Sequence, residues 1–420
     1  MKKFLVVLLA LGLIVAFSAP AAATDVKFSG SYYVAGWYNS NQSLQKDAGS
    51  SNAFYSQRLR VQTVFQVAEG LKLTTRFDAM ERVWGLEAVG STPGTDEKNI
   101  QWERVYVTFN TLGGTFDVGY QSGGTFGTVF GDQVAGGVPR IKYTYVNGPL
   151  KVLGVIEKGE EADIGTTCAD KDYDKYIVAP IYKWDGGNAG ILIEYLNDAR
   201  PSDISDGDYK ARWWLLDPYF KATFGPVYVE GEFFLKTGKK VKMEEAGTDE
   251  DYNGKSAYLM VKVDLDKFYV GGQLAWVEGD DPNTTDKDEN GWTGQDYNPC
   301  LILFGEDAFN KFGGNFGTNS TTNDTMSNAK LYQVFAGFRP LAKLDTMASF
   351  TLAKADQKGT NVDDDYGTEF DITATYKVYD NLSYMVGFGY LWTGDYYKGN
   401  SAGNKVDDNY MVMNKLTLTF

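Results

Sequence analysis

The sequence predicts an all-β fold, an antiparallel up-and-down β-barrel that crosses a membrane, and three observations lead to it. From Val26 onward the chain repeats segments of about ten residues in which apolar and polar side chains alternate. Between these segments, short turns alternate with long loops. After the first 23 residues, no apolar run is long enough for a membrane-spanning helix. A chain that crosses lipid without such helices needs a closed barrel, because only closure pairs every backbone polar group.

The composition agrees with this fold. Aromatic residues make up 15% of the chain, and it contains 47 Gly and 28 Tyr but only 11 Pro. Aromatic residues favour strands and gather at membrane interfaces, and glycine is frequent in tight turns. The sequence therefore predicts strands with aromatic belts rather than a helical domain.

The first residues are typical of an export signal. Met1-Lys2-Lys3 is basic, Phe4 to Phe17 is apolar, and Ala21-Ala22-Ala23 has the small residues of a cleavage site. A membrane anchor is the alternative, but this apolar run is shorter than the ~20 residues that a spanning helix needs. We therefore expect residues 1–23 to be a cleaved signal peptide and residues 24–420 to form the barrel.

Alternation with a period of two is clearest in segments 58–67 and 369–378. In the first, Leu59, Val61 and Thr63 alternate with arginine and glutamine; in the second, Phe370 and Ile372 alternate with acidic residues and threonine. Side chains of a strand point to opposite faces in turn, so each strand separates an apolar from a polar environment.

The connections determine the expected number of strands. Short breaks lie at 68–70, 110–114, 147–149, 185–188, 225–226, 264–266, 339–340 and 379–381. Long breaks lie near 39–53, 85–99, 121–139, 158–173, 198–209, 237–254, 279–328, 355–366 and 394–408. Together they separate 18 strands, with 16 as the alternative, and we expect periplasmic short turns and extracellular long loops, 279–328 being the largest. A soluble β-sandwich or solenoid would explain the alternation but not the two classes of connection.

The charged and reactive residues exclude several functions. Histidine is absent, which removes the commonest general base, zinc ligand and haem ligand. The formal net charge of −15 opposes nucleic-acid binding. We therefore predict neither an enzyme nor a bound cofactor or metal.

Several segments resemble the general porin family of Gram-negative bacteria. They are residues 119–145, which read GYQSGGTFGTVFGDQVAGGVPRIKYTY, residues 56–62, which read SQRLRVQ, and the strands of 366–397. The resemblance implies an outer-membrane diffusion channel for small hydrophilic solutes and ions, narrowed by its third loop and often a homotrimer. That loop is 121–139 here. Asp132 is its single carboxylate, where the family usually has several, so charge selectivity stays open.

The C-terminus resembles the signal that the barrel-assembly machinery reads in outer-membrane proteins. The chain ends on Phe420, and Tyr410, Val412, Leu416 and Leu418 share its parity, with Asn414 interrupting the row. We expect Phe420 to mediate that interaction.

Assigning the apolar face to lipid places a basic wall inside the barrel. Its residues are Arg58, Arg60, Arg76, Arg82, Arg104, Arg140 and Lys142. Such a wall would set the field in the pore. Alternatively, these side chains pair with inward carboxylates such as Asp78, Glu103 and Asp117 and brace the wall.

The long loops carry the cysteines and most of the excess acid. Cys168 and Cys300 both lie in long loops of an exported chain, so we predict a disulfide between them. Acidic runs near 157–163, 280–289 and 363–365 would either concentrate cations or bridge lipopolysaccharide through divalent ions. Asp286 to Gly291 matches the first half of a calcium loop, but Tyr297 occupies its glutamate position.

Two functions remain after these exclusions. The first is passive diffusion through an open pore. The second is a scaffold that sheathes a partner protein, such as a cytochrome, which would have to bring every haem because the chain has no haem motif.

Overall fold

The computed structural model describes most of the barrel and parts of its loops. Described are residues 25–41, 43–47, 51–85, 100–124, 126–131, 133–161, 172–200, 209–243, 248–294, 296–305, 326–401 and 403–420, without the side chains of 124, 133–136 and 209. The predicted signal peptide, 1–23, lies outside these residues.

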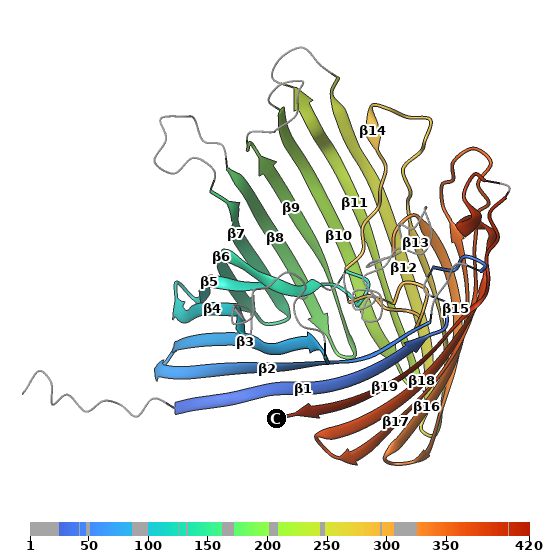
Figure 1. Cartoon of the computed structure of the whole chain (residues 1–420). Helices are drawn as coiled ribbons and strands as arrows, with labels where there is room; N and C mark the ends of the chain where they lie inside the picture. Colours follow the sequence, from blue (N-terminus) through green and yellow to red (C-terminus); the bar gives the residue numbers. More distant parts are fainter. Residues whose placement is uncertain are drawn as a thin grey trace, which may run out of the picture.

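Eighteen antiparallel strands form a closed barrel (Figure 1). The strands are β1 (Asp25–Asn39), β2 (Asn52–Ala68), β3 (Leu71–Val83), β4 (Ile100–Thr111), β5 (Gly114–Gly124), β6 (Gln133–Asn147), β7 (Leu150–Glu160), β8 (Tyr173–Trp184), β9 (Gly187–Asp198), β10 (Tyr209–Phe224), β11 (Val227–Met243), β12 (Glu250–Leu265), β13 (Phe268–Val277), β15 (Ala329–Leu341), β16 (Leu344–Ala355), β17 (Asp365–Tyr379), β18 (Leu382–Thr393) and β19 (Asn409–Thr419). The first strand pairs with both β2 and β19, which closes the sheet. The predicted fold and the count of 18 are confirmed.

Two smaller elements lie in the loops. The two-residue strand β14 (Lys287–Asp288) pairs in parallel with β12, and the 3-10 helix η1 (Asp395–Lys398) precedes β19. No helix among the described residues is long and apolar enough to span a membrane.

The connections fall into the two predicted classes, with several shifted boundaries. The predicted loop 237–254 is shorter than expected, because β11 continues to Met243 and β12 begins at Glu250. The turn expected at Arg339-Pro340 lies instead at 342–343, because β15 continues to Leu341. Proline has no N–H to donate to a sheet, and the β15–β16 register shifts between Phe338 and Leu341, next to Pro340. The predicted loop 121–139 is shorter than expected, because β5 continues to Gly124 and β6 begins at Gln133.

The outer face of the barrel is apolar. Val178, Val334 and Ile372 are among its exposed aliphatic residues, at positions of outward parity. Exposed aromatic side chains lie at both ends: Trp184, Phe224, Phe268 and Tyr379 beside the short turns, and Trp84, Trp102 and Trp392 near the long loops. An apolar band between two aromatic girdles is the surface that a bilayer requires.

The terminal residue closes the seam between β19 and β1. Gly30 and Phe420 exchange two backbone hydrogen bonds, of 2.8 and 3.1 Å. A Cβ atom on Gly30 would lie 2.2 Å from the carbonyl oxygen of Arg60 and 2.7 Å from Cζ of Phe420, so both the neighbouring strand and the terminal ring require a glycine there.

Candidate functional site

The third loop, 126–131, leaves β5 and β6 and reaches across the barrel to β11 (Figure 1). There the buried carboxylate of Glu232 accepts the N–H of Thr128 at 3.0 Å, the N–H of Gly131 at 3.1 Å and the Thr128 hydroxyl. Gly127 has a φ of +76°, and a Cβ on it would lie 1.6 Å from Oε1 of Glu232. One inward carboxylate therefore holds the tip of the loop against the opposite wall.

The large connection between β13 and β15 also enters the barrel. Its residues 292–294 and 296–305 pack against inward positions of β12 and of β15 to β17. Glu369 of β17 is fully buried and accepts the N–H groups of Ile302 and Leu303, both at 2.7 Å. The side chain of Gln333 donates to the carbonyl of Pro299 at 2.6 Å. The sequence placed 279–328 outside the barrel, and this part of it folds back inside.

The two inward loops contact each other. Gly294 donates its N–H to the carbonyl of Phe130 at 2.7 Å. The fully buried Phe130 ring stacks on Tyr258, with centroids 5.2 Å apart, and meets Tyr297 edge-on at 5.1 Å. The loops thus form one partition that packs against β11 to β18, and the wall of β2 to β6 remains.

That remaining wall carries the predicted basic residues, most of them in ion pairs with a neighbouring strand. Arg60 binds Asp78 through two hydrogen bonds of 2.7 and 2.6 Å. The other pairs are Arg58 with Asp78 and Glu81 at 3.8 and 3.7 Å, Arg76 with Glu103 at 3.4 Å, Arg140 with Glu157 at 2.7 Å, and Lys142 with Asp117 at 2.9 Å. The wall is therefore a ladder of alternating charges.

Two of the predicted wall residues differ from this pattern. Arg104 lies opposite Arg76, and its Nε atom is buried without a hydrogen-bond partner in the described structure. Arg82 is not part of the inner wall. A bulge around Met80 inserts an extra residue into β3, which sets Arg82 opposite the outward-facing Gln57. A one-residue insertion reverses which face each later side chain takes. The third-loop carboxylate Asp132 lies outside the described residues.

Cys300 lies inside the barrel on the large loop. Its side chain is buried, and its sulfur is 3.4 Å from Oγ1 of Thr351. Burial raises the pKa of the Cys300 thiol well above its usual value. Cys168 lies outside the described residues, so the disulfide stays a prediction. The ligand atoms of Cys300, Glu369 and Asp371 lie within 4.8 Å of one another, so this is a group that could hold a metal ion.

The half-matching calcium loop has other partners. Asp288 binds the ammonium of Lys240 at 2.9 Å and the N–H of Asn290 at 2.9 Å, while the carbonyl of Asp286 accepts the N–H of Asp251. These contacts tie β14 and its flanking residues to both β11 and β12.

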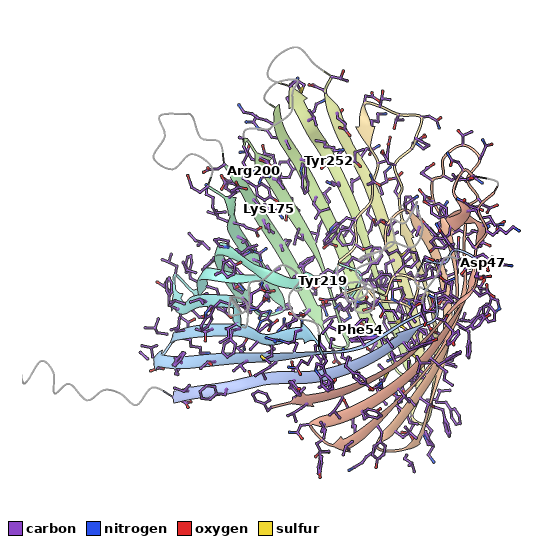
Figure 2. All side chains as sticks on the ribbon, viewed as in Figure 1. Asp47, Phe54, Lys175, Arg200, Tyr219 and Tyr252 are labelled. Atoms are coloured by element: carbon purple, nitrogen blue, oxygen red, sulfur yellow. The ribbon has the colours of Figure 1, made fainter. Side chains whose placement is uncertain are left out.

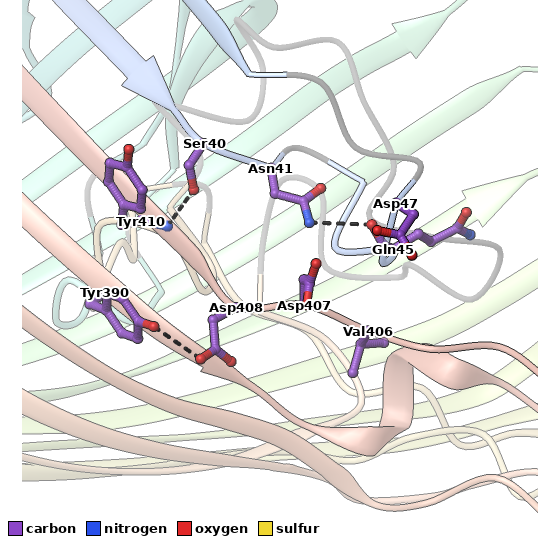
Figure 3. Close-up of a pocket in the computed structure, with 9 residues that line it drawn as sticks. All are labelled: Ser40, Asn41, Gln45, Asp47, Tyr390, Val406, Asp407, Asp408 and Tyr410. Atoms are coloured by element: carbon purple, nitrogen blue, oxygen red, sulfur yellow. Dashed lines mark hydrogen bonds between the residues drawn. The ribbon is translucent and has the colours of Figure 1, made fainter.

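A cavity of about 710 Å³ lies at the long-loop end, between residues 40–47 and 406–408 (Figure 3). Tyr390 and Tyr410 enter it from outward positions, and the Tyr390 hydroxyl donates to Asp408 at 3.0 Å. This cavity therefore opens outside the channel and does not belong to the pore.

The sequence alone did not identify Glu232 and Glu369, the two carboxylates that hold the loops. Most inward carboxylates have basic neighbours: Glu157, for example, lies directly opposite Arg140 on one neighbouring strand and Lys175 on the other. Glu232 and Glu369 do not. Glu369 faces Thr351 and Leu391, and Glu232 faces Tyr219 and Tyr258. An inward acid without a basic cross-strand neighbour is the signal that would have found them, and it needs the strand register.

The inner face of β8 to β12 combines charge with aromatic rings. Lys175 of β8, Tyr219 of β10 and Tyr252 of β12 lie along this wall (Figure 2). The ammonium of Lys236 sits 3.3 Å from the centroid of Tyr252 and 4.8 Å from that of Trp213. Cations over ring faces are stabilised without a carboxylate in contact, so the rings of Tyr252 and Trp213 hold the Lys236 ammonium at this wall.

Comparison with solved structures gives similar barrels at low sequence identity. OccK9 (OpdG) of Pseudomonas aeruginosa is 13% identical, with a TM-score of 0.53 over 94% of this chain and 99% of that one. The outer membrane protein OprD of the same species is 12% identical, with a TM-score of 0.52 over 96% of each chain. OccAB4 of Acinetobacter baumannii is 11% identical, with a TM-score of 0.51 over 96% of this chain and 99% of that one. These are channels of Gram-negative outer membranes. The chain has the fold of an outer-membrane channel. No protein-family model and no curated protein matches the sequence.

Proposed function

We propose that this chain is an outer-membrane porin, a passive diffusion channel for small hydrophilic solutes and ions. The observation that carries the proposal is a closed barrel with an apolar outside and a charged inner wall, partly filled by its own loops. Loops that narrow a barrel leave a path whose width and lining charge select solutes. No catalytic group takes part.

The inward loops weigh against the scaffold alternative. A partner protein inside the barrel would need the space that 126–131, 292–294 and 296–305 occupy. Displacing them would break the hydrogen bonds to Glu232 and Glu369 and expose the buried Phe130. Leaving such buried polar groups unpaired is costly, so an open diffusion path is the simpler function.

Export and assembly complete the proposal. Residues 1–23 direct the chain through the inner membrane and are cleaved, and the ring of Phe420 at the seam meets the barrel-assembly machinery. The short turns face the periplasm, the acidic long loops face lipopolysaccharide, and three copies form the channel.

Planar-bilayer recording tests the proposed function. The purified protein, shown to be folded by heat-modifiable gel migration, should add stepwise conductance to a bilayer. Its reversal potential in a salt gradient reports charge selectivity. Folded protein that inserts into liposomes but adds no conductance would contradict the proposal and favour a closed scaffold.

A further inference from the structure

A second cavity lies inside the barrel, beneath the tip of the third loop and towards the short turns. Its volume is about 500 Å³, and residues 126–129 of the loop form one side of it. Phe126 meets Tyr219 of β10 edge-on, with centroids 4.9 Å apart. A solute that passes the loop on its way to the short turns would therefore meet this cavity.

Four polar side chains line the cavity in a row, one from each of four adjacent strands. They are Lys151 of β7, Lys183 of β8, Asn188 of β9 and Lys221 of β10. Asn188 lies directly opposite both Lys183 and Lys221. Lys151 lies opposite Ile181, which is two residues before Lys183 on the same strand. Neighbouring strands are about 4.8 Å apart, so flexible lysine side chains in such a row can converge on one ligand.

Unlike most basic residues of β2 to β6, these lysines are not in contact with a described carboxylate, although Glu230 is the cross-strand neighbour of Lys221. None of Lys151, Lys183 and Lys221 makes an ion pair with any residue that the structure describes. The Lys221 ammonium lies 5.8 Å from the centroid of the Tyr219 ring. Three like charges around one cavity repel one another, and an anion between them would remove that repulsion.

The remaining groups of the cavity define the charge of the ligand. Glu230 is its one described carboxylate, and the hydroxyls of Tyr228 and Tyr258 donate to it at 2.7 and 3.0 Å. Three ammonium groups and this one carboxylate line the cavity, and the carboxylate of Glu232 lies behind residues 127 and 128, so the ammonium groups are in excess. The side-chain oxygen of Asn188 accepts the Tyr219 hydroxyl at 2.7 Å, so its NH₂ group stays available as a donor.

We propose that this cavity, the lysine pocket, is a binding subsite for small doubly charged oxyanions, of which sulfate and hydrogen phosphate are the simplest. The inference rests on the proposed channel function, because the pocket lies on the solute path. Lysine binds such groups as a point charge, and the row of lysines would hold an oxyanion briefly between the third loop and the short-turn mouth.

Block of single-channel current tests the lysine pocket. The full-length mature protein is recorded in ~1 M KCl, where the screening length falls to ~3 Å and remote charges contribute little. Sulfate and phosphate should each reduce or interrupt the current with a saturable dependence, and nitrate at equal ionic strength should not. The triple variant Lys151→Gln, Lys183→Gln, Lys221→Gln should raise the half-blocking sulfate concentration by at least about tenfold, since it removes all three charged contacts to the anion.

A matched control removes the same charge from the same end of the barrel. Lys72, Lys262 and Lys377 lie at inward positions near the short turns of β3, β12 and β17, outside the pocket. Replacing these three with glutamine should change the half-blocking concentration by less than about threefold, because their charges are screened at the pocket.

The outcomes separate the two proposals. Normal conductance without sulfate or phosphate block would overturn the lysine pocket and leave the channel function standing. Equal loss of block in both triple variants would also overturn it, because a general field would then explain the binding. Absence of conductance would overturn the channel function and this inference with it. If the triple variant does not insert into the bilayer, single Lys→Gln variants of the pocket and of the control lysines give the same comparison of half-blocking concentrations.

Discussion

Replacing Glu369 should release the large loop from the inner wall. The carboxylate is fully buried and accepts two backbone N–H groups, those of Ile302 and Leu303, both at 2.7 Å. Hydrogen bonds to a charged group contribute roughly 1.5 to 3 kcal/mol each, so Glu369→Leu removes about 3 to 6 kcal/mol of loop docking. Glu369→Gln keeps one acceptor and should remove about half of that.

Cys300 reports on the release, because it lies on the same loop. In the docked loop it is buried, and burial raises the pKa of its thiol. The thiolate is the nucleophile, so maleimide should label it very slowly. With Cys168→Ser as the background, Glu369→Leu should label at least about tenfold faster, with Glu369→Gln between. Single-channel conductance and current noise should rise in the same order.

Glu194→Gln is the control for this experiment. Glu194 is a buried inward carboxylate that pairs with Lys175 at 3.5 Å, and no described hydrogen bond joins it to either inward loop. Its replacement should leave the labelling rate unchanged. Equal labelling rates in folded wild-type and Glu369→Leu barrels would refute the anchoring role of Glu369.

Three further results are expected. Arg60→Ala deprives the buried Asp78 of its two short hydrogen bonds and should cost roughly 3 to 5 kcal/mol of stability. The temperature at which the barrel unfolds on heat-modification gels should fall, and an unchanged temperature would argue against the pairing. Arg104→Gln should move the reversal potential towards cation selectivity at low salt, and the shift should be smaller at ~1 M salt because of screening. An unchanged reversal potential would place Arg104 off the conducting path. Protein denatured without reductant should show no free thiol if Cys168 and Cys300 are bonded, and two titrated thiols would exclude the bond.

Strand positions were predictable because they follow from a local pattern. Alternation with a period of two in 58–67 and 369–378 marks which residues face lipid, and it does not depend on which strands are neighbours. The same local reasoning failed at Arg82. Its parity was counted from Arg76, but the bulge at Met80 interrupts the count. A bulge leaves little trace in composition, so only the strand register reveals it.

The inward course of the loops was predictable only in part. The resemblance of 119–145 to the general porin family indicated a pore loop at 121–139, and the structure brings 126–131 into the barrel. Nothing in 279–328 distinguished its inward part from an exposed loop. Its docking depends on Glu369, which becomes adjacent only when β17 has paired with β16 and β18.

The sequence by itself determined the closed barrel, its 18 strands and the inward position of most basic residues, because side-chain alternation and turn length are local properties. The tertiary structure alone decided which charges are paired and which are not. Arg60 and Asp78 lie 18 residues apart, yet they meet across two strands, whereas the three pocket lysines make no ion pair with a described residue. Cross-strand register and the path of the loops set these distances, and electrostatic energy depends on distance rather than on order along the chain.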